Sequence, residues 1–378
     1  MNQKTVKFQP LYRFVSSVDA RIYYWCLSIT LLWRLGLEVI NQTIIPLMTP
    51  GPGIQVPGTV LAPGVRSGLL RWASAWDAAW YTTITQHGYV IVNHFKSYES
   101  IAFFPLFPYT VRVISSFVPL PYRAVGLALN VLFTSLAVYF LYQLTKLMAQ
   151  EAGLKSQATK LSKVSVALLL LNPSVFFFAA YYADALLVML VTASIYYGYK
   201  NTFIVAACCA GLATATKSIG LVLLPTLLIL YWIRSGENLG GLLRKHLPKL
   251  VAMGVLSVGG LLTYMAYLWM RFGDPLIFLK IEKYWNRNVS GFFLNNIWGI
   301  WYSKIFNIHY FGSISDYMYS LFIMAIPVAI LVFAIYVIIR HQLRFSWLAV
   351  MCVTTLLLPI STGLLLSLNR YVLLLTPA

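Results

Sequence analysis

AVGLALNVLFTSLAVYFLYQLTKL, residues 124–147, is an apolar run whose one charged residue, Lys146, lies near its end. A helix needs roughly 20 residues to cross a hydrocarbon core of about 30 Å, so this run is long enough to span a bilayer. The chain is 60% hydrophobic and 10% charged, with a mean hydropathy of +0.75, which is outside the range of soluble domains. Comparable runs lie at 22–47, 250–270, 317–339 and 347–366. The sequence therefore predicts an all-α polytopic membrane protein.

Four more apolar stretches are too short or too interrupted to be ordinary spans. They lie at 164–181, 184–199, 203–217 and 219–233 and contain Pro173, Gly211, Gly220 and Pro225. Breaks of this kind are tolerated only where protein or a water-filled cavity satisfies the freed backbone groups, so this middle block is expected to line a cavity. In the stretch 103–120, Pro105 and Pro108 prevent a regular helix at its start and favour an interfacial or re-entrant element.

Loop charges predict how the chain is oriented. Provided that 103–120 does not fully cross, the loops on the side of the basic N-terminus are 146–163, the one at Lys200, 234–249 and 340–344. Each of them carries Lys or Arg, which is the pattern of the inner side of a membrane. The same rule explains much of the net charge of +18, so no nucleic-acid partner is inferred. Two long segments, 49–102 and 272–315, then become outer loops of a single transmembrane domain over residues 1–378. The last apolar run, which starts at Tyr371, is too short to cross. We expect the chain to be truncated inside that helix, and the alternative is a natural chain that ends without completing it.

One carboxylate stands out in this acid-poor chain. Asp77 has Trp76, Trp80 and Tyr81 as near neighbours, and the chain has only 10 Asp and Glu against 28 Lys and Arg. Asp is also favoured as a helix N-cap, and that is the structural alternative. The aromatic surroundings favour a pocket in which Asp77 acts as a general base. Trp76 and Tyr81 are then candidates for substrate contact.

Four other residues are expected on the same outer side. Asp184 is an acid at membrane depth, which marks a functional candidate, although it could equally cap the next helix. Lys217 and Arg370 either extend their charges to the interface or bind a phosphate. His87, which opens His-Gly-Tyr, either contacts a ligand or makes a structural hydrogen bond.

Motifs of soluble nucleotide-dependent enzymes are absent from the sequence. It contains no GxxxxGK[ST], no HExxH and no pair of CxxC motifs. All four cysteines lie in apolar runs, which suggests neither disulfides nor a zinc site. No large polar block is available to bind a soluble nucleotide sugar. A donor substrate is therefore expected to arrive through the membrane.

Several segments resemble the PIG-V family of mannosyltransferases. They are WDAAWYTTITQHGY (76–89), FFPLFP (103–108), NPSVFFFAAYYADALL (172–187), ATKSIG (215–220) and a terminal NRY (369–371). The resemblance implies a GT-C-type glycosyltransferase with about 9–11 membrane segments and a catalytic acid in the first outer loop. It places Asp77 at the family's Trp-Asp acid, and His87, Asp184 and Lys217 at further motif positions. The sequence departs from the family pattern at Ala75, where the family commonly has Arg. Arg71 is the candidate to make the donor contact in place of that arginine.

The resemblance also implies the reaction. An inverting transferase would move a sugar, mannose by analogy, from a polyprenyl- or dolichyl-phosphate donor to a lipid or glycan acceptor on the outer face. Such a reaction requires no cofactor. The alternative is a reaction assisted by a divalent metal ion. The compact loops favour a bacterial plasma membrane over the endoplasmic reticulum. The alternative function is a multi-pass transporter or lipid flippase, which would also use broken helices and an outer vestibule.

Overall fold

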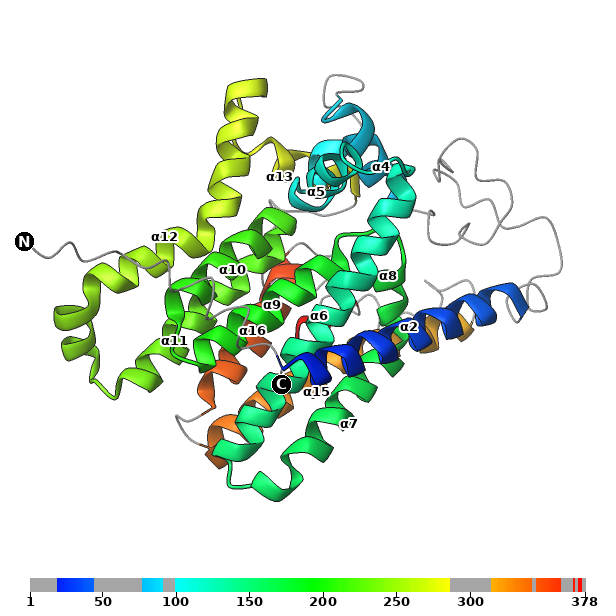
Figure 1. Ribbon diagram of the computed structural model, residues 1–378. Coiled ribbons are helices and arrows are strands. Elements are labelled where there is room, and N and C mark those ends of the chain that lie inside the picture. The colour runs from blue at the N-terminus through cyan, green and yellow to red at the C-terminus, as the bar shows by residue number, and fades with distance from the viewer. Residues whose placement is uncertain are drawn as a thin grey trace, which may run out of the picture.

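The computed structural model describes residues 19–43, 77–90, 99–285, 314–341, 345–361, 370 and 373–375 (Figure 1). In these ranges the regular elements are all helices. The longer ones are α2 (Ala20–Thr43), α4 (Ala78–His87), α5 (Leu106–Ser115), α6 (Tyr122–Glu151), α7 (Ala158–Leu171), α9 (Asp184–Tyr199), α10 (Phe203–Thr216), α11 (Leu223–Ser235), α12 (Leu239–Phe272), α15 (Ile314–His341) and α16 (Ser346–Ser361). The shorter ones are η3 (Ser100–Ala102), η4 (Lys155–Gln157), η5 (Pro173–Val175), α8 (Phe176–Ala179), η6 (Ser218–Val222), α13 (Ile277–Ile281), η7 (Glu282–Trp285) and η9 (Leu373–Leu375).

The described helices confirm an all-α polytopic membrane protein with short and broken spans. Three of them are long and apolar enough to cross a membrane: Tyr122–Glu151, Ser218–Ser235 and Leu239–Phe272. A fourth candidate, Lys155–Leu171 with Pro173–Ala179, bends by 68° at Pro173, where sequence analysis predicted a break. The apolar helices α9 and α10 are shorter than a full span, again as predicted. The total of 9–11 segments remains a prediction.

Helix α9 is the centre of the bundle because it is apolar on every side. Fourteen of its residues are buried, and α6 and α10 pack against it. A helix without a polar face is stable only inside a protein core or a membrane. Its first residue, Asp184, and its last residue, Tyr199, therefore lie at opposite ends of a buried central helix.

Glycines bring α10 and α12 into backbone contact. A Cβ atom at Gly260 would collide with the carbonyl oxygen of Gly211, and a Cβ atom at Gly211 would collide with the carbonyl oxygen of Leu256. Thr214 adds a hydrogen bond across the same contact, accepting from the backbone N–H of Leu261 at 3.2 Å. Small residues allow this close approach of helices in membranes. The contact fixes α10, whose C-terminal end carries Lys217.

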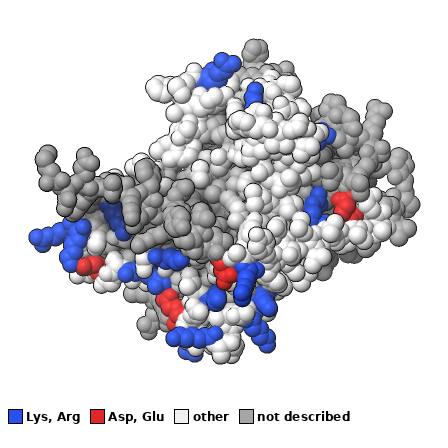
Figure 2. Space-filling view, in the orientation of Figure 1, with Lys and Arg blue, Asp and Glu red and all other residues white. Residues whose placement is uncertain are grey.

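Basic residues gather at one end of the bundle, along the lower edge of the face in Figure 2. Arg234 pairs with Glu151 at 2.8 Å, and its guanidinium lies 4.2 Å from the centre of the Tyr199 ring. Tyr199 in turn contacts Trp347, at 6.0 Å between ring centres. These contacts join the C-terminal ends of α6, α9 and α11 to the start of α16. The loops predicted to share one side of the membrane are thus close together.

Helices α4 and α5 cover the opposite end of the bundle (Figure 1). Helix α5 has 10 residues and is about 15 Å long, so it is too short to cross a membrane. This agrees with an interfacial or re-entrant role for the proline-containing stretch. Much of the two predicted outer loops, 49–76, 91–98 and 286–313, and the predicted truncation point lie outside the described residues.

Candidate active site

Four charged side chains from distant parts of the chain meet at the end of the bundle covered by α4. The Arg370 guanidinium donates from Nη1 to Oδ2 of Asp77 and from Nη2 to Oδ2 of Asp184, both at 2.9 Å. Lys217 Nζ donates to the other oxygen of Asp184 at 2.8 Å. We call Asp77, Asp184, Lys217 and Arg370 the charged tetrad. Its two acids and two bases were all candidates from the sequence.

Asp77 precedes α4 but does not cap it with its side chain. Its carboxylate makes no hydrogen bond to the first turn of α4 and contacts Arg370 instead. The backbone N–H of Asp77 donates to the hydroxyl oxygen of Tyr182 at 3.1 Å. Further along α4, the hydroxyl of Thr85 lies 2.8 Å from that of Tyr181. Two adjacent tyrosines thus fix α4, and with it Asp77, against the bundle.

Asp184 is the first residue of α9 and the most buried member of the charged tetrad, with its side chain 5% exposed. The chain enters α9 through the residues around Tyr182, and Asn130 of α6 holds this turn. The Asn130 side-chain amide donates to the carbonyl oxygens of Ala180 and Tyr182. A buried carboxylate is stable only with opposite charges and hydrogen bonds around it, and Arg370 and Lys217 supply both.

Lys217 ends α10 in an extended conformation. Its backbone N–H still bonds to the carbonyl of Ala213 at 3.0 Å, so the residue is held to the last turn while its side chain leaves the helix. Three residues later, Gly220 lies against the backbone of Ala213 and Thr214, where a Cβ atom would collide. The Thr-Lys-Ser-Ile-Gly sequence therefore forms a tight corner that directs the lysine to Asp184.

Aromatic rings surround the Arg370 guanidinium. Its carbon atom lies 4.4 Å from the centre of the Phe177 ring and 5.2 Å from that of Tyr182. Cations are attracted to aromatic faces at such distances. Burial raises the pKa of Tyr182, and the nearby carboxylate of Asp77 raises it further, so the phenol keeps its proton. Tyr182 is therefore a neutral partner beside the charged groups.

Two candidates from the sequence do not belong to the charged tetrad. His87 is exposed at the last turn of α4, about 15 Å along the helix from Asp77. Tyr81 is buried, and its ring packs on Phe103 and Phe107 and also contacts the Tyr182 ring, at 6.2 Å between ring centres, so it lies beside the site. Trp76, like Arg71 and Ala75, lies outside the described residues.

Three residues at the site were not identified from the sequence. Tyr182 and Phe177 lie within a motif that we quoted, but nothing in their spacing distinguished them from the other aromatic residues. Asn130 carried a usable signal, because it is an amide in the middle of the apolar run 124–147. A polar side chain at that depth needs hydrogen-bond partners inside the protein.

Among the described residues, no group of three His, Cys, Asp or Glu side chains is arranged to hold a metal ion. Arg370 and Lys217 are two positive charges at this end that could face a phosphate. Arg can bind a phosphate through two parallel hydrogen bonds, and Lys binds one as a compact charge. The arrangement can thus bind an anion and place a carboxylate beside it.

A comparison with protein families identifies the chain. The sequence profile of the family described as Mannosyltransferase (PIG-V) matches residues 20–355. The chain belongs to the PIG-V mannosyltransferase family. This result confirms the resemblance inferred from the motifs, and it favours an enzyme over a transporter or flippase. Searches of curated proteins and of solved structures each found no match.

Family membership makes this PIG-V protein a multi-pass membrane glycosyltransferase that transfers mannose. The matched range includes Asp77, Asp184 and Lys217, whereas Arg370 follows it by fifteen positions. The connection of Arg370 to the site therefore comes from the contacts in the structure and not from the family match.

Proposed function

We propose that this PIG-V protein transfers mannose from a polyprenyl- or dolichyl-phosphate donor to a hydroxyl of a lipid or glycan acceptor. The reaction takes place at the end of the bundle that holds the charged tetrad, on the extracytoplasmic face. The membrane is a bacterial plasma membrane, or the endoplasmic reticulum in a eukaryote. A lipid-linked donor is supported by the composition of the given sequence, 60% hydrophobic and 10% charged, which offers little polar surface for a soluble nucleotide sugar.

The observation that carries the proposal is the difference between the two acids of the charged tetrad. Asp184 has two cationic partners and is 5% exposed, whereas Asp77 has one cationic partner and is 25% exposed. Asp77 is therefore the carboxylate that an acceptor hydroxyl can reach. Asp184 is a positioning residue that holds Arg370 and Lys217 side by side.

In the proposed mechanism, the acceptor oxygen attacks the anomeric carbon of mannose while Asp77 takes the hydroxyl proton. The bond between the anomeric carbon and the phosphate oxygen breaks, and the lipid phosphate leaves with the electron pair. A single displacement inverts the anomeric configuration. Arg370 and Lys217 stabilise the charge that develops on the leaving phosphate, which fixed cations do effectively in a site with little water.

The contact between Arg370 and Asp77 must change when the donor binds. In the structure, both ends of the Arg370 guanidinium are occupied by carboxylates. A donor phosphate takes the place of Asp77 at Nη1, and Asp77 is then free to accept a proton. Asp184 remains on Nη2 and keeps the guanidinium in place.

The test is mannose transfer in membranes supplied with radiolabelled polyprenyl-phosphate mannose and a membrane extract containing acceptors. We expect Asp77→Asn to reduce the rate by at least about a hundredfold, the usual scale for loss of a general base. Asp274→Asn is the matched control, because Asp274 is an acid of similar exposure, 26%, that is paired with Lys280 and not with the charged tetrad. A wild-type rate for Asp77→Asn would contradict the proposal, as would an equal loss in Asp274→Asn.

A further inference from the structure

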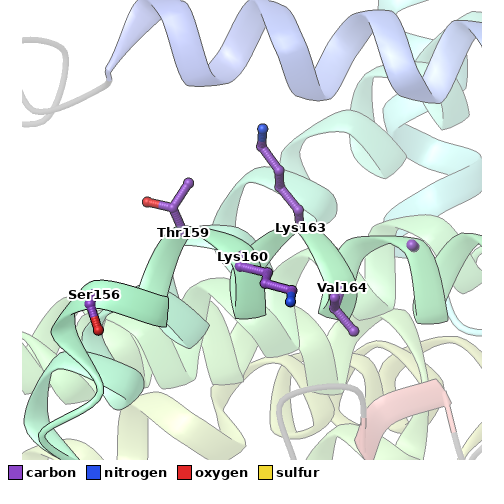
Figure 3. A pocket seen from close by; sticks show the side chains of 6 residues that line it. Ser156, Thr159, Lys160, Lys163 and Val164 are labelled. Atoms are coloured by element: carbon purple, nitrogen blue, oxygen red, sulfur yellow. The ribbon is translucent and has the colours of Figure 1, made fainter.

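A surface depression of about 520 Å³ lies on α7, distant from the charged tetrad (Figure 3). Its lining combines two lysines, two hydroxyl side chains and two apolar residues: Ser156, Thr159, Lys160, Lys163, Val164 and Ala167. It begins at the N-terminal end of α7, whereas the chain reaches Asp184 from the C-terminal end. The 14 residues of α7 separate these ends by about 20 Å. The depression is thus not part of the proposed active site.

The depression is positively charged, and no acidic side chain among the described residues forms an ion pair with its lysines. Lys160 forms no ion pair with an acid in the described ranges, and Lys163 lies 5.8 Å from the centre of the Trp25 ring of α2. Figure 3 shows Lys163 extended towards α2. The acid nearest in sequence, Glu151, is paired with Arg234. On α2, Asp19 accepts hydrogen bonds from the backbone of the first helical turn.

An apolar stripe continues from the depression along the same face of α7. Val164, Leu168 and Leu171 follow Lys160 at intervals of four, four and three residues, which places all four on one side of the helix. Leu168 is 68% exposed and Leu171 is 79% exposed. In a membrane protein, such a face is covered by lipid chains. The charged depression and the apolar stripe together match a molecule with an anionic head and a hydrocarbon tail.

We propose that the depression on α7 binds an anionic phospholipid from the leaflet at the basic end of the bundle. Lys160 and Lys163 hold its phosphate, the hydroxyls of Ser156 and Thr159 donate hydrogen bonds to it, and one acyl chain lies along Val164, Leu168 and Leu171. Basic pockets between helices at this membrane level bind acidic head groups. The first turn of α7 adds a favourable helix dipole for a phosphate. Free inorganic phosphate would not use the apolar stripe.

The test is native mass spectrometry of the purified full chain with added phosphatidylglycerol. Lys160→Gln with Lys163→Gln removes both charges of the depression, and Lys155→Gln with Lys200→Gln is the matched control, since those exposed lysines lie outside it. We expect the first pair to weaken binding of one lipid by about tenfold or more and the control pair to change it less than twofold. Equal losses in both pairs would overturn the proposal.

Two further comparisons separate the sources of the phosphate. Phosphatidylcholine should bind at least about tenfold more weakly than phosphatidylglycerol, and equal binding would show that charge is not recognised. Inorganic phosphate in excess should not displace the lipid, and displacement would indicate a simple phosphate site instead.

Leu168→Ser should weaken phosphatidylglycerol binding because it interrupts the apolar stripe. No effect of Leu168→Ser would contradict the proposed position of the acyl chain.

A measurement on the unaltered protein does not depend on the folding of any variant. Phosphatidylglycerol with a photoreactive acyl chain is added to vesicles of phosphatidylcholine that contain the protein, and the adducts are mapped by peptide mass spectrometry. We expect the main adducts between Ser156 and Leu171. Adducts spread evenly over α2, α7 and α12 would overturn the proposal.

Discussion

Arg370 donates a 2.9 Å hydrogen bond to Asp77, although 293 positions separate the two residues in the sequence. The same guanidinium bonds to Asp184, so one side chain connects the start of α4 with the start of α9. Charge-assisted hydrogen bonds of this kind are roughly twice as strong as neutral ones. The contact links the outer helix that carries the proposed base to the centre of the bundle.

This relationship predicts that Asp77→Asn keeps or increases affinity for the donor while it removes transfer. The neutral amide competes less well than a carboxylate for Arg370, so the donor phosphate finds the guanidinium more available. We expect a dissociation constant equal to or lower than that of wild type for a non-transferable phosphonate analogue of the donor. Affinity at least about tenfold weaker, a loss of roughly 1.4 kcal/mol, would show that Asp77 itself binds the donor.

Arg370→Lys should impair transfer even though it preserves the charge. A lysine ammonium cannot bridge two carboxylates in the fixed geometry of a guanidinium, nor stack on Phe177 in the same way. We expect kcat/KM to fall by about 10- to 100-fold, corresponding to about 1.4–2.8 kcal/mol of lost stabilisation. Arg234→Lys is the control, because Arg234 pairs with Glu151 at the other end of the bundle. A comparable loss in that variant would mean that both substitutions act through stability.

Asp184→Asn should reduce stability, because it leaves Arg370 and Lys217 close together without the carboxylate between them. Removal of one partner from a buried ion pair costs about 3–5 kcal/mol. Adding Lys217→Met removes one of the two cations, so the double variant should regain part of the lost thermal stability. Transfer should remain low in both, since a cation for the phosphate is missing or misplaced. Thermal unfolding in detergent and the transfer assay together test this, and a double variant less stable than Asp184→Asn would contradict it.

Gly260→Ala should destabilise the protein, whereas the neighbouring Gly259→Ala should not. A methyl group at Gly260 collides with the backbone of α10, but one at Gly259 meets no atom within 4 Å. Overpacking of a tight contact typically costs about 1–3 kcal/mol. Comparison of the two melting temperatures measures the effect with the same chemical change on the same helix. Equal melting temperatures would show that α10 and α12 separate easily.

The sequence predicted the spans at 124–147 and 250–270, because hydropathy over about 20 residues depends on the membrane and not on packing. It was wrong to place 219–233 among the short stretches, since the helix Ser218–Ser235 is long enough to cross a membrane. It also identified the four members of the charged tetrad, since ionisable groups in apolar surroundings are few. It could not determine which of them touch. Arg370 and Asp77 come from opposite ends of the chain, and no local pattern reports such a contact.

Two residues of the predicted site, His87 and Tyr81, are not members of the charged tetrad, for physical reasons. His87 was grouped with Asp77 because the two share a motif, but a helix of 10 residues separates its ends by about 15 Å. Tyr81 was chosen as an aromatic neighbour of Asp77, yet the turn of the helix directs it into the core. The role of Asn130 as a support for the turn before Asp184 depends on packing between α6 and that turn, which the sequence does not reveal.

The glycine contact between α10 and α12 has a consequence for how the site adjusts to its substrates. No layer of side chains lies between the two backbones at Gly211 and Gly260, so there is nothing there that can change rotamer and let α10 shift alone. The backbone at Lys217, at the end of α10, therefore moves only if both helices move together. In the proposed mechanism, the attachment point of the lysine thus stays fixed relative to α12, and Arg370 and the segment that carries Asp77 are the parts that adjust to the substrates.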